Sequence, residues 1–418
     1  MRNGVIGIVI GLVVGATVIA PRLAPSVPVS GAVPSVLKPA AGPATRVSAA
    51  ENLAAAPLAP KRSPRVRWKM GSAFAAALPQ LGTLAKRVDE EIWRVSGGDM
   101  EIKFHDPGTL VPTLDMFDAV ASGAIDAAFS SPGSWGTQSP ALRLFSAVPF
   151  GPPADEYLAW VYFGCGRELF ENLHRRHNIH ALVCGIIAPE ASGWFRNEIQ
   201  TLEDFKGLRM GFLGLGAKVL TKLGVETRAL TGGNVFLALE AGAVDATEYS
   251  MPAIDLKLGF HAMAKHYYFP GWHQPATLCS LMINMDRWEE LNSARQARVG
   301  SVCGDNIRHG LAEGEALQFA ALQLKGVQMH RWPDTILDVL ESSWQDVVVE
   351  EATADEDFKQ VWESMSEFRR DYGIWKELGH LNRWAADGLP ARLVLAVPRM
   401  QSPSPWLNKV PPGRASAS

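Results

Sequence analysis

The chain has 418 residues, and its 40 Lys and Arg residues against 43 Asp and Glu residues give a net charge of −3. This near-balance argues against a protein built mainly to bind nucleic acid or an anionic membrane surface, and the 47% hydrophobic share rules out a chain that is disordered throughout. The length predicts two or three domains. The four cysteines form no C-x-x-C pair, which argues against a thiol zinc site and a thioredoxin-like motif.

Residues 1–21 are expected to direct export or to anchor the chain in a membrane. After Arg2 an uncharged apolar run extends from Gly4 to Ala20. A positive start before an apolar stretch is typical of a signal peptide, and the run is at the short limit for a membrane span. Both interpretations stay open. Residues 22–65 are rich in proline and alanine, which predicts a linker without a core of its own.

The folded region is expected over residues 66–388 and begins with alternating strands and helices. The apolar patterns predict strands over 66–70, 100–104 and 124–129, with helices over about 76–97 and 112–122 between them. Short strands separated by helices of this length are typical of βαβ units on a mostly parallel sheet.

One segment recurs within the chain. Residues 117–126 (FDAVASGAID) are matched by residues 236–245 (FLALEAGAVD), an offset of 236 − 117 = 119. In each copy a predicted helix ends at a glycine, Gly123 or Gly242, that can adopt the left-handed capping conformation. Each copy then enters a strand whose carboxyl end lies where open α/β sheets bind ligands. The repeat predicts two similar lobes that face one cleft, with coincidence between common turns as the alternative.

The carboxyl-terminal part is predicted to be helical. Apolar residues at helical spacing mark residues 334–370, an interruption is expected at 371–373, and a short helix is expected to carry the helical tail to about 385. Residues 389–418 return to proline and serine and are expected to form a loosely ordered tail.

Motifs of common enzymes are absent from the sequence. It contains no H-E-x-x-H, no G-x-x-x-x-G-K and no G-x-S-x-G, so the chain is not expected to be an enzyme. The glycines of residues 211–216 predict a tight turn rather than a dinucleotide site. His174, His177 and His180 are expected at a solvated helix end, with a metal site as the alternative. Cys184 and Cys279 are expected to be buried thiols rather than a disulfide.

A set of short motifs, in order along the chain, resembles one family. The set comprises L110-V-P, F117-D-A-V, V148-P-F-G, G193-W-F-R, L202-E-D-F-K-G-L, G242-A-V-D-A-T-E, L258-G-F-H and Y268-F-P-G-W-H-Q-P. Together these motifs resemble the solute-binding receptors of TRAP (tripartite ATP-independent periplasmic) transporters, especially the branch that binds α-keto acids. The resemblance extends over about residues 66–381.

The resemblance implies an α/β fold with two lobes like those of periplasmic binding proteins, joined by crossing hinge strands and followed by a long carboxyl-terminal helix. Lobe I is expected to comprise about residues 66–187 plus 246–283, and lobe II about residues 188–245 plus 284–340. The helical tail would extend over about residues 334–385.

The resemblance also implies a function. It predicts a periplasmic receptor that binds a small organic solute, with an organic acid as one candidate, between the lobes and delivers it to permease subunits in the membrane. A homodimer through the carboxyl-terminal helix is expected as well. The alternative is a degenerate receptor that acts as a tethered sensor or interaction module without transport.

The position that holds a ligand-binding arginine in the family is Gly211 here, and Arg209, two residues earlier, is the candidate substitute. Without that arginine, simple monocarboxylates such as pyruvate are expected to bind weakly unless a cation intervenes. Other residues expected to line the ligand pocket are Phe74, Trp135, Glu190, Tyr249 and Gln274.

The family's cation ligands correspond to Glu190, Glu248 with Tyr249, and Gln274 in this chain. Acid and amide are exchanged at two of these positions, but the set still offers two carboxylates and one carboxamide, which are ligands that Na⁺ or Ca²⁺ can use. These side chains are therefore expected to converge in the cleft. The alternative is that both glutamates are ordinary hydrated acids at the cleft edge.

Overall fold

The structure is a computed structural model that describes residues 65–230, 233–322 and 326–380. The predicted export segment, nearly all of the linker and the tail at 389–418 lie outside the described residues. In the described ranges no helix has both the length and the apolar character needed to cross a membrane.

The first sheet is mixed and has the strand order β2-β1-β3-β10-β4. Strand β1 is parallel to β2 and β3, whereas β10 is antiparallel to β3 and β4. The strands are β1 (Val66–Ser72), β2 (Met100–His105), β3 (Ala127–Ser130), β4 (Ile179–Ile187) and β10 (Thr277–Asn284).

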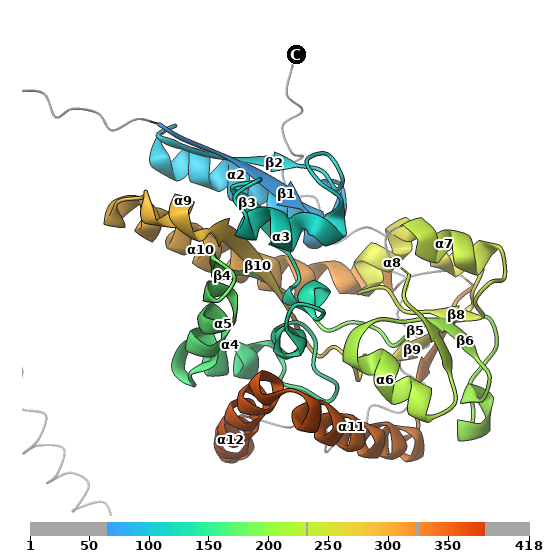
Figure 1. The fold of residues 1–418 in the computed structure, drawn as a ribbon. Coiled ribbons are helices and arrows are strands. Elements are labelled where there is room, and N and C mark those ends of the chain that lie inside the picture. The colour runs from blue at the N-terminus through green and yellow to red at the C-terminus, as the bar shows by residue number, and fades with distance from the viewer. Residues whose placement is uncertain (1–64, 231–232, 323–325, 381–418) are drawn as a thin grey trace, which may run out of the picture. The chain divides into compact units, whose positions relative to one another are not determined.

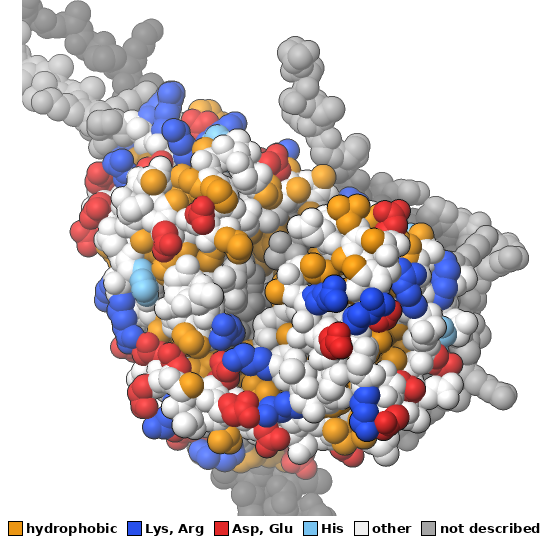
Figure 2. Space-filling model, turned by 45° about the vertical axis from the view of Figure 1, so that its right-hand side comes forward, with side chains coloured by type: hydrophobic (Ala, Val, Ile, Leu, Met, Phe, Trp, Pro, Cys, Tyr) orange, Lys and Arg blue, Asp and Glu red, His pale blue; other side chains and the backbone are white. Residues whose placement is uncertain are grey.

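The second sheet is also mixed, with the order β11-β9-β5-β8-β6-β7. Its strands are β5 (Gly193–Phe195), β6 (Arg209–Gly211), β7 (Glu226–Arg228), β8 (Ala246–Thr247), β9 (His266–Phe269) and β11 (Gln328–Arg331). Two sheets with their own helices confirm the predicted two-lobed α/β fold (Figure 1). Figure 2 shows the surface hollowed between the two lobes.

Helices surround the sheets. They are α2 (Leu81–Ser96), α3 (Met116–Ala121), α4 (Ala154–Phe163), α5 (Gly166–Arg175), α6 (Gly214–Lys222), α7 (Gly233–Glu240), α8 (Pro252–Leu258), α9 (Met285–Glu289), α10 (Ser293–Ala321), α11 (Asp334–Ala354) and α12 (Glu356–Gly379). Helix α2 shows why they form, because its buried Leu84, Val88 and Ile92 recur every four residues and so share one face.

The internal repeat is present in both lobes. Helix α3 leads into β3 of the first sheet, and α7 leads into β8 of the second. The glycines after the two helices have φ of 76° at Gly123 and 68° at Gly242, the left-handed conformation that glycine adopts without a steric penalty. The prediction that the two copies belong to two similar lobes is confirmed.

The strands divide between the lobes differently from the expected boundaries. Of residues 246–283, β8 and β9 join the second sheet and only β10 joins the first. Helix α10, expected in lobe II, packs against β4 and α2 of the first lobe. A periodic pattern identifies a helix, but it does not show which sheet the helix covers.

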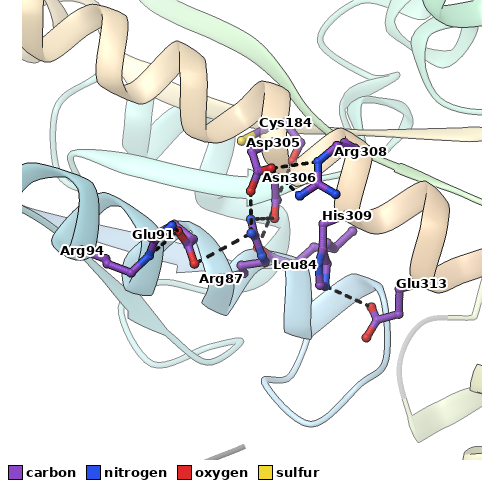
Figure 3. A network of polar contacts seen from close by, with 10 residues as sticks. All are labelled: Leu84, Arg87, Glu91, Arg94, Cys184, Asp305, Asn306, Arg308, His309 and Glu313. Carbon is purple, nitrogen blue, oxygen red and sulfur yellow. Dashed lines mark hydrogen bonds and ion pairs between the residues drawn. The ribbon is translucent and has the colours of Figure 1, made fainter. Parts of the chain in front are cut away.

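Specific polar contacts hold α10 on the first lobe (Figure 3). The Asn306 side chain donates to the carbonyl oxygens of Leu84 at 3.2 Å and Cys184 at 2.7 Å, and Arg87 of α2 pairs with Asp305 at 2.6 Å. Buried backbone carbonyls at this junction are thereby satisfied, which fixes the helix against both elements.

Two expectations about cysteine and histidine are wrong. Cys184 of β4 forms a disulfide with Cys303 of α10, whereas Cys279 is a buried free thiol as expected. His174 is fully buried rather than solvated, and its Nδ1 lies 2.9 Å from the Phe170 carbonyl oxygen. Burial lowers the pKa of His174 to about 4. Spacing alone did not reveal that the last turn of α5 faces the core.

The expected interruption of the tail lies at a different residue. Helix α11 ends at Ala354, and Asp355 caps the next helix by accepting the Phe358 N–H at 2.6 Å. Residues 371–373 continue inside α12. An aspartate that begins a new helix was the stronger signal than the glycine at 373.

Candidate functional site

Two of the segments on which the chain passes between the two sheets are neighbours. Residues 188–192 connect β4 to β5, and residues 270–276 connect β9 to β10. The Glu190 N–H donates to the Gln274 carbonyl at 3.2 Å, and the Gly271 N–H donates to the Glu190 carbonyl at 3.0 Å. A Cβ at Gly271 would lie 2.2 Å from that carbonyl oxygen, so only glycine permits this close approach.

Three ionisable side chains meet beside these crossing segments. They are Glu190 and His273 from the two crossings and Glu248 from the end of β8, with 5%, 2% and 9% exposure. The His273 Nε2 atom lies 3.9 Å from Glu190 Oε2 and 3.6 Å from Glu248 Oε1. One ligand atom from each residue lies within 4.8 Å of the others. The arrangement offers three donor atoms to one point.

Most of these donor atoms have no hydrogen-bond partner. Glu190 Oε1 accepts from the Ser250 hydroxyl at 2.9 Å, but Glu190 Oε2, Glu248 Oε1 and both His273 nitrogens are buried and have no hydrogen-bond partner among the described residues. An unpaired buried polar atom costs about 1–3 kcal/mol, and a cation at the centre would satisfy all three side chains. The carboxylates suit Ca²⁺, and the imidazole extends the range to metals such as Mn²⁺ and Zn²⁺.

The electrostatics of the cluster agree with a cation site. Burial, and then the neighbouring Glu248, raises the pKa of Glu190, and burial also raises the pKa of Glu248. Burial lowers the pKa of His273 to about 4. These shifts favour the protonated carboxyl groups and the neutral imidazole in the absence of a cation, and a bound cation would take the place of those protons.

A further buried acid lies close by. Asp255 accepts hydrogen bonds from the Trp194 indole N–H at 3.0 Å and the Tyr267 hydroxyl at 2.8 Å. Burial raises its pKa well above the usual range, and the charge of Glu248 acts in the same direction. This carboxyl was not expected from the sequence, since an aspartate in an apolar helix carries no distinguishing motif.

The structure brings Glu190 and Glu248 together as expected, but with His273 rather than with the Gln274 amide. The Gln274 side chain donates to Thr277 Oγ1 at 2.7 Å, and its contact with Glu190 is through the backbone. The sequence did not predict His273 as a ligand, because the ligands that the resemblance implies are oxygen donors, among them the adjacent Gln274. Tyr249 lies nearby: burial first, then the charges of neighbouring acids, raises its pKa to about 12.

Arg209 is already engaged by another residue. Its Nε and terminal nitrogen bind the two oxygens of Asp245 at 2.8 and 2.7 Å. At Gly211 a Cβ would lie 2.9 Å from Thr247 Oγ1 and 3.4 Å from Leu230 Cδ1. The space next to this glycine is therefore filled by Thr247 and Leu230, and Arg209 is held in its own ion pair.

The two remaining expected pocket residues lie in the first lobe. Phe74 is half-buried in the turn after β1, where its N–H donates to Ser72 Oγ at 3.1 Å. Trp135 is 1% exposed, and its indole N–H donates to Ser130 Oγ at 3.0 Å. Both follow the carboxyl end of a strand of the first sheet, the edge at which such folds bind ligands.

Residues 70–338 match the model of the bacterial extracellular solute-binding proteins, family 7. The chain belongs to this family. Its members bind solutes and are not enzymes, in agreement with the absence of catalytic motifs.

Known relatives are similar over most of the folded region. The chain is 32% identical to the monocarboxylate 2-oxoacid-binding periplasmic protein of Nostoc sp., over 76% of this chain and 88% of that protein.

Two solved structures are similar as well. One is a TRAP transporter solute-binding protein of Bordetella bronchiseptica, a dimer with copurified calcium and picolinate in one site. It is 30% identical, with a TM-score of 0.73, over 76% of this chain and 95% of that chain. A TRAP periplasmic solute-binding protein of Colwellia psychrerythraea with bound calcium and pyruvate has 27% identity and a TM-score of 0.73, over 77% and 99%.

Proposed function

We propose that the protein is the extracytoplasmic solute receptor of a TRAP-type transporter. It binds a small organic acid through a cation held by Glu190, Glu248 and His273, and it delivers the acid to permease subunits in the membrane. The observation that carries this proposal is the set of unpaired, buried donor atoms on these three residues, at the segments where the chain crosses between the lobes.

The chemistry of the site favours a carboxylate ligand bound through the cation. The carboxylates of Glu190 and Glu248 neutralise a divalent ion, which retains open positions for ligand oxygens. Gly211 supplies no guanidinium and Arg209 is bound to Asp245, so the cation is the positive group that attracts the ligand. The relatives that contain calcium together with picolinate or pyruvate support this arrangement.

Binding would close the lobes on the ligand. Phe74 and Trp135 are proposed to contact it from the first lobe, and Tyr249 and Gln274 from the segments near the cation. Closure exchanges water contacts for protein contacts, and no covalent bond is made or broken. Hinge closure of this kind is the general behaviour of periplasmic binding proteins.

The location and the partners follow from the same proposal. Residues 1–21 would direct export or retain the protein at the inner membrane, with residues 22–65 as the linker. A homodimer through α11 and α12 is also proposed, and the dimeric Bordetella relative supports it.

The test is calorimetric titration with pyruvate and picolinate in Ca²⁺ and in chelator. Binding is expected only with Ca²⁺, and at a hundredfold excess of ligand over Kd the protein should gain about 2.7 kcal/mol of stability. Glu248→Gln should abolish the effect of Ca²⁺, whereas Glu240→Gln on exposed α7 should leave it unchanged.

Sub-micromolar pyruvate binding in chelator would contradict the role of the cation. If no organic acid binds with Ca²⁺, Na⁺, Mn²⁺ or Zn²⁺, the receptor function is wrong and the tethered sensor or interaction module is favoured instead.

A further inference from the structure

Two histidines meet at the edge of the second sheet. His266 opens β9 and His330 lies in β11, the edge strand that pairs with it in parallel. In this register His330 is opposite Tyr268, two residues after His266, so both imidazoles are on the same face of the sheet. The Nδ1 atom of His266 lies 3.0 Å from the Nε2 atom of His330.

A carboxylate lies beside one of these rings. Glu198 Oε1 lies 3.6 Å from the Nδ1 atom of His330. A carboxylate on this side favours the tautomer with the proton on Nδ1, which leaves the lone pair of Nε2 directed toward His266. A carboxylate behind an imidazole is the arrangement that supports metal-binding histidines.

Packing holds the same ring in place. His330 stacks on Tyr268 at 4.6 Å with an interplanar angle of 15°, and Tyr268 stacks on Trp332 at 4.2 Å. The Tyr268 hydroxyl donates to the Ile199 carbonyl at 2.9 Å, next to Glu198. His330 is therefore held by this cluster before any ligand arrives, which reduces the entropy lost on binding.

We propose that His266 Nδ1 and His330 Nε2 bind a first-row transition-metal ion such as Zn²⁺ or Cu²⁺, with Glu198 as the supporting carboxylate. Two imidazole nitrogens at about 2.0–2.1 Å from one metal lie about 2.9–3.4 Å apart for bond angles between 90° and 109°. The observed separation of 3.0 Å lies in this interval. Without metal, one hydrogen lies between the two nitrogens. When the metal binds, this hydrogen leaves His266 Nδ1 and His266 carries its proton on Nε2 instead, so both rings stay neutral.

Access and charge are compatible with the ion. Both histidines are partly exposed, so water can complete the coordination. The nearby Lys265 ammonium donates to the His261 carbonyl at 2.6 Å, and Glu198 contributes negative charge. Imidazole nitrogens select transition metals over Ca²⁺, and the pair lacks the two buried carboxylates that suit Ca²⁺ at the site of Glu190. A bound ion would fasten the edge strand β11 to β9.

The test is titration with Zn²⁺ of the untagged full chain that carries His273→Gln, in excess Ca²⁺, so that the site at Glu190 offers Zn²⁺ no imidazole. One Zn²⁺ per chain is expected at the histidine pair. His266→Gln and His330→Gln should each weaken binding at least about tenfold, and Glu198→Gln by about tenfold, as for other supporting carboxylates. His309→Gln is the matched control, because His309 is an exposed histidine beside Glu313 without a second imidazole.

Cu²⁺ gives an independent measurement on the same His273→Gln chain, where electron paramagnetic resonance should show two equatorial imidazole nitrogens. Circular dichroism identifies any variant that fails to fold. No Zn²⁺ binding up to millimolar concentration, Zn²⁺ binding that persists in both histidine variants, or a Cu²⁺ signal without two imidazoles would each overturn the proposal.

Discussion

At the scale of single residues, Gly211 is the position at which the resemblance implies a ligand-binding arginine. A Cβ at this position would lie 2.9 Å from Thr247 Oγ1, so an arginine cannot be placed here without changing its neighbour. A side chain at position 211 and the hydroxyl of Thr247 therefore compete for one space.

Gly211→Arg alone is expected to destabilise the protein by about 1–3 kcal/mol, because it overpacks a filled site. Gly211→Arg with Thr247→Ala should recover stability and bind pyruvate in chelator, since a guanidinium pairs directly with a carboxylate. Urea unfolding and calorimetry measure the two effects, with Thr247→Ala alone as the control. Equal stability of the single and double variants would contradict this account.

The pH dependence of stability follows from the same buried cluster. The folded-state pKa values of Glu190 and Glu248 are raised, so the metal-free folded protein binds more protons than the unfolded chain above the ordinary pKa of glutamate. Stability is therefore lost as pH rises through the folded pKa. His273, whose pKa is lowered to about 4, has the opposite effect, but only below its ordinary value of 6.5.

Between pH 6.5 and 8 the free energy of unfolding of the metal-free protein should fall by up to about 1.4 kcal/mol per pH unit for each carboxyl group that is protonated in the folded state and ionised in the unfolded chain. Ca²⁺ should stabilise the protein more at pH 8 than at pH 6.5, because at pH 8 fewer protons compete with the ion for the carboxylates. Urea unfolding at both pH values, in chelator and in Ca²⁺, measures this. Glu248→Gln should make the metal-free profile less steep, because Glu190 and Asp255 keep their raised pKa values, and a flat wild-type profile would contradict the prediction.

At the scale of secondary-structure elements, the disulfide joins β4 to α10 over a sequence separation of 119 residues. Strand β4 leads directly into the crossing segment that carries Glu190, so the disulfide and the Asn306 contacts fix the start of that segment. The long helix serves as the support of the first lobe at the hinge.

Cys184→Ala with Cys303→Ala is expected to lower the free energy of unfolding by about 2–5 kcal/mol, because a long loop is released in the unfolded chain. The effect should be reproduced in the wild type by a reductant. Guanidinium unfolding provides the measurement, and Cys165→Ser at an exposed free thiol is the control. A double variant as stable as the control would show that the cross-link does not stabilise the fold.

At the scale of the whole folded region, the carboxyl-terminal helices contact both lobes (Figure 1). Glu351 of α11 accepts from Lys218 of α6 in the second lobe, and Arg143 of the short helix Pro140–Phe145 in the first lobe lies 3.3 Å away. One nearly buried carboxylate therefore connects the two lobes through α11.

Glu351→Gln is expected to lower stability by about 1–3 kcal/mol, because two cations lose a charged hydrogen-bond partner. Glu350→Gln is the matched control, because Glu350 is exposed and pairs with Lys222. Loss of this exposed ion pair should cost less than about 1 kcal/mol. Urea unfolding compares the two variants. Equal effects would mean that the contact between the lobes adds nothing beyond a surface ion pair.

Much of the fold was predictable because it depends on local patterns. The strand β1, the helix–glycine–strand repeat and the helical tail were all found from apolar periodicity and glycine positions. The cation cluster was predictable in part. Glu190 and Glu248 follow from their motifs, but the choice between His273 and Gln274 depends on how the turn at Gly271 aims two adjacent side chains, which spacing does not encode.

The sequence by itself determined the lobes, the repeat and the absence of an arginine at 211, since each of these is written in residue identity and short-range order. Only the tertiary structure decided that α10 covers the first sheet, that Cys184 finds Cys303, that Arg209 is paired with Asp245 and that His266 meets His330. Each of these is a contact between residues that lie far apart along the chain. They depend on how whole elements pack, a property that no single segment of sequence contains.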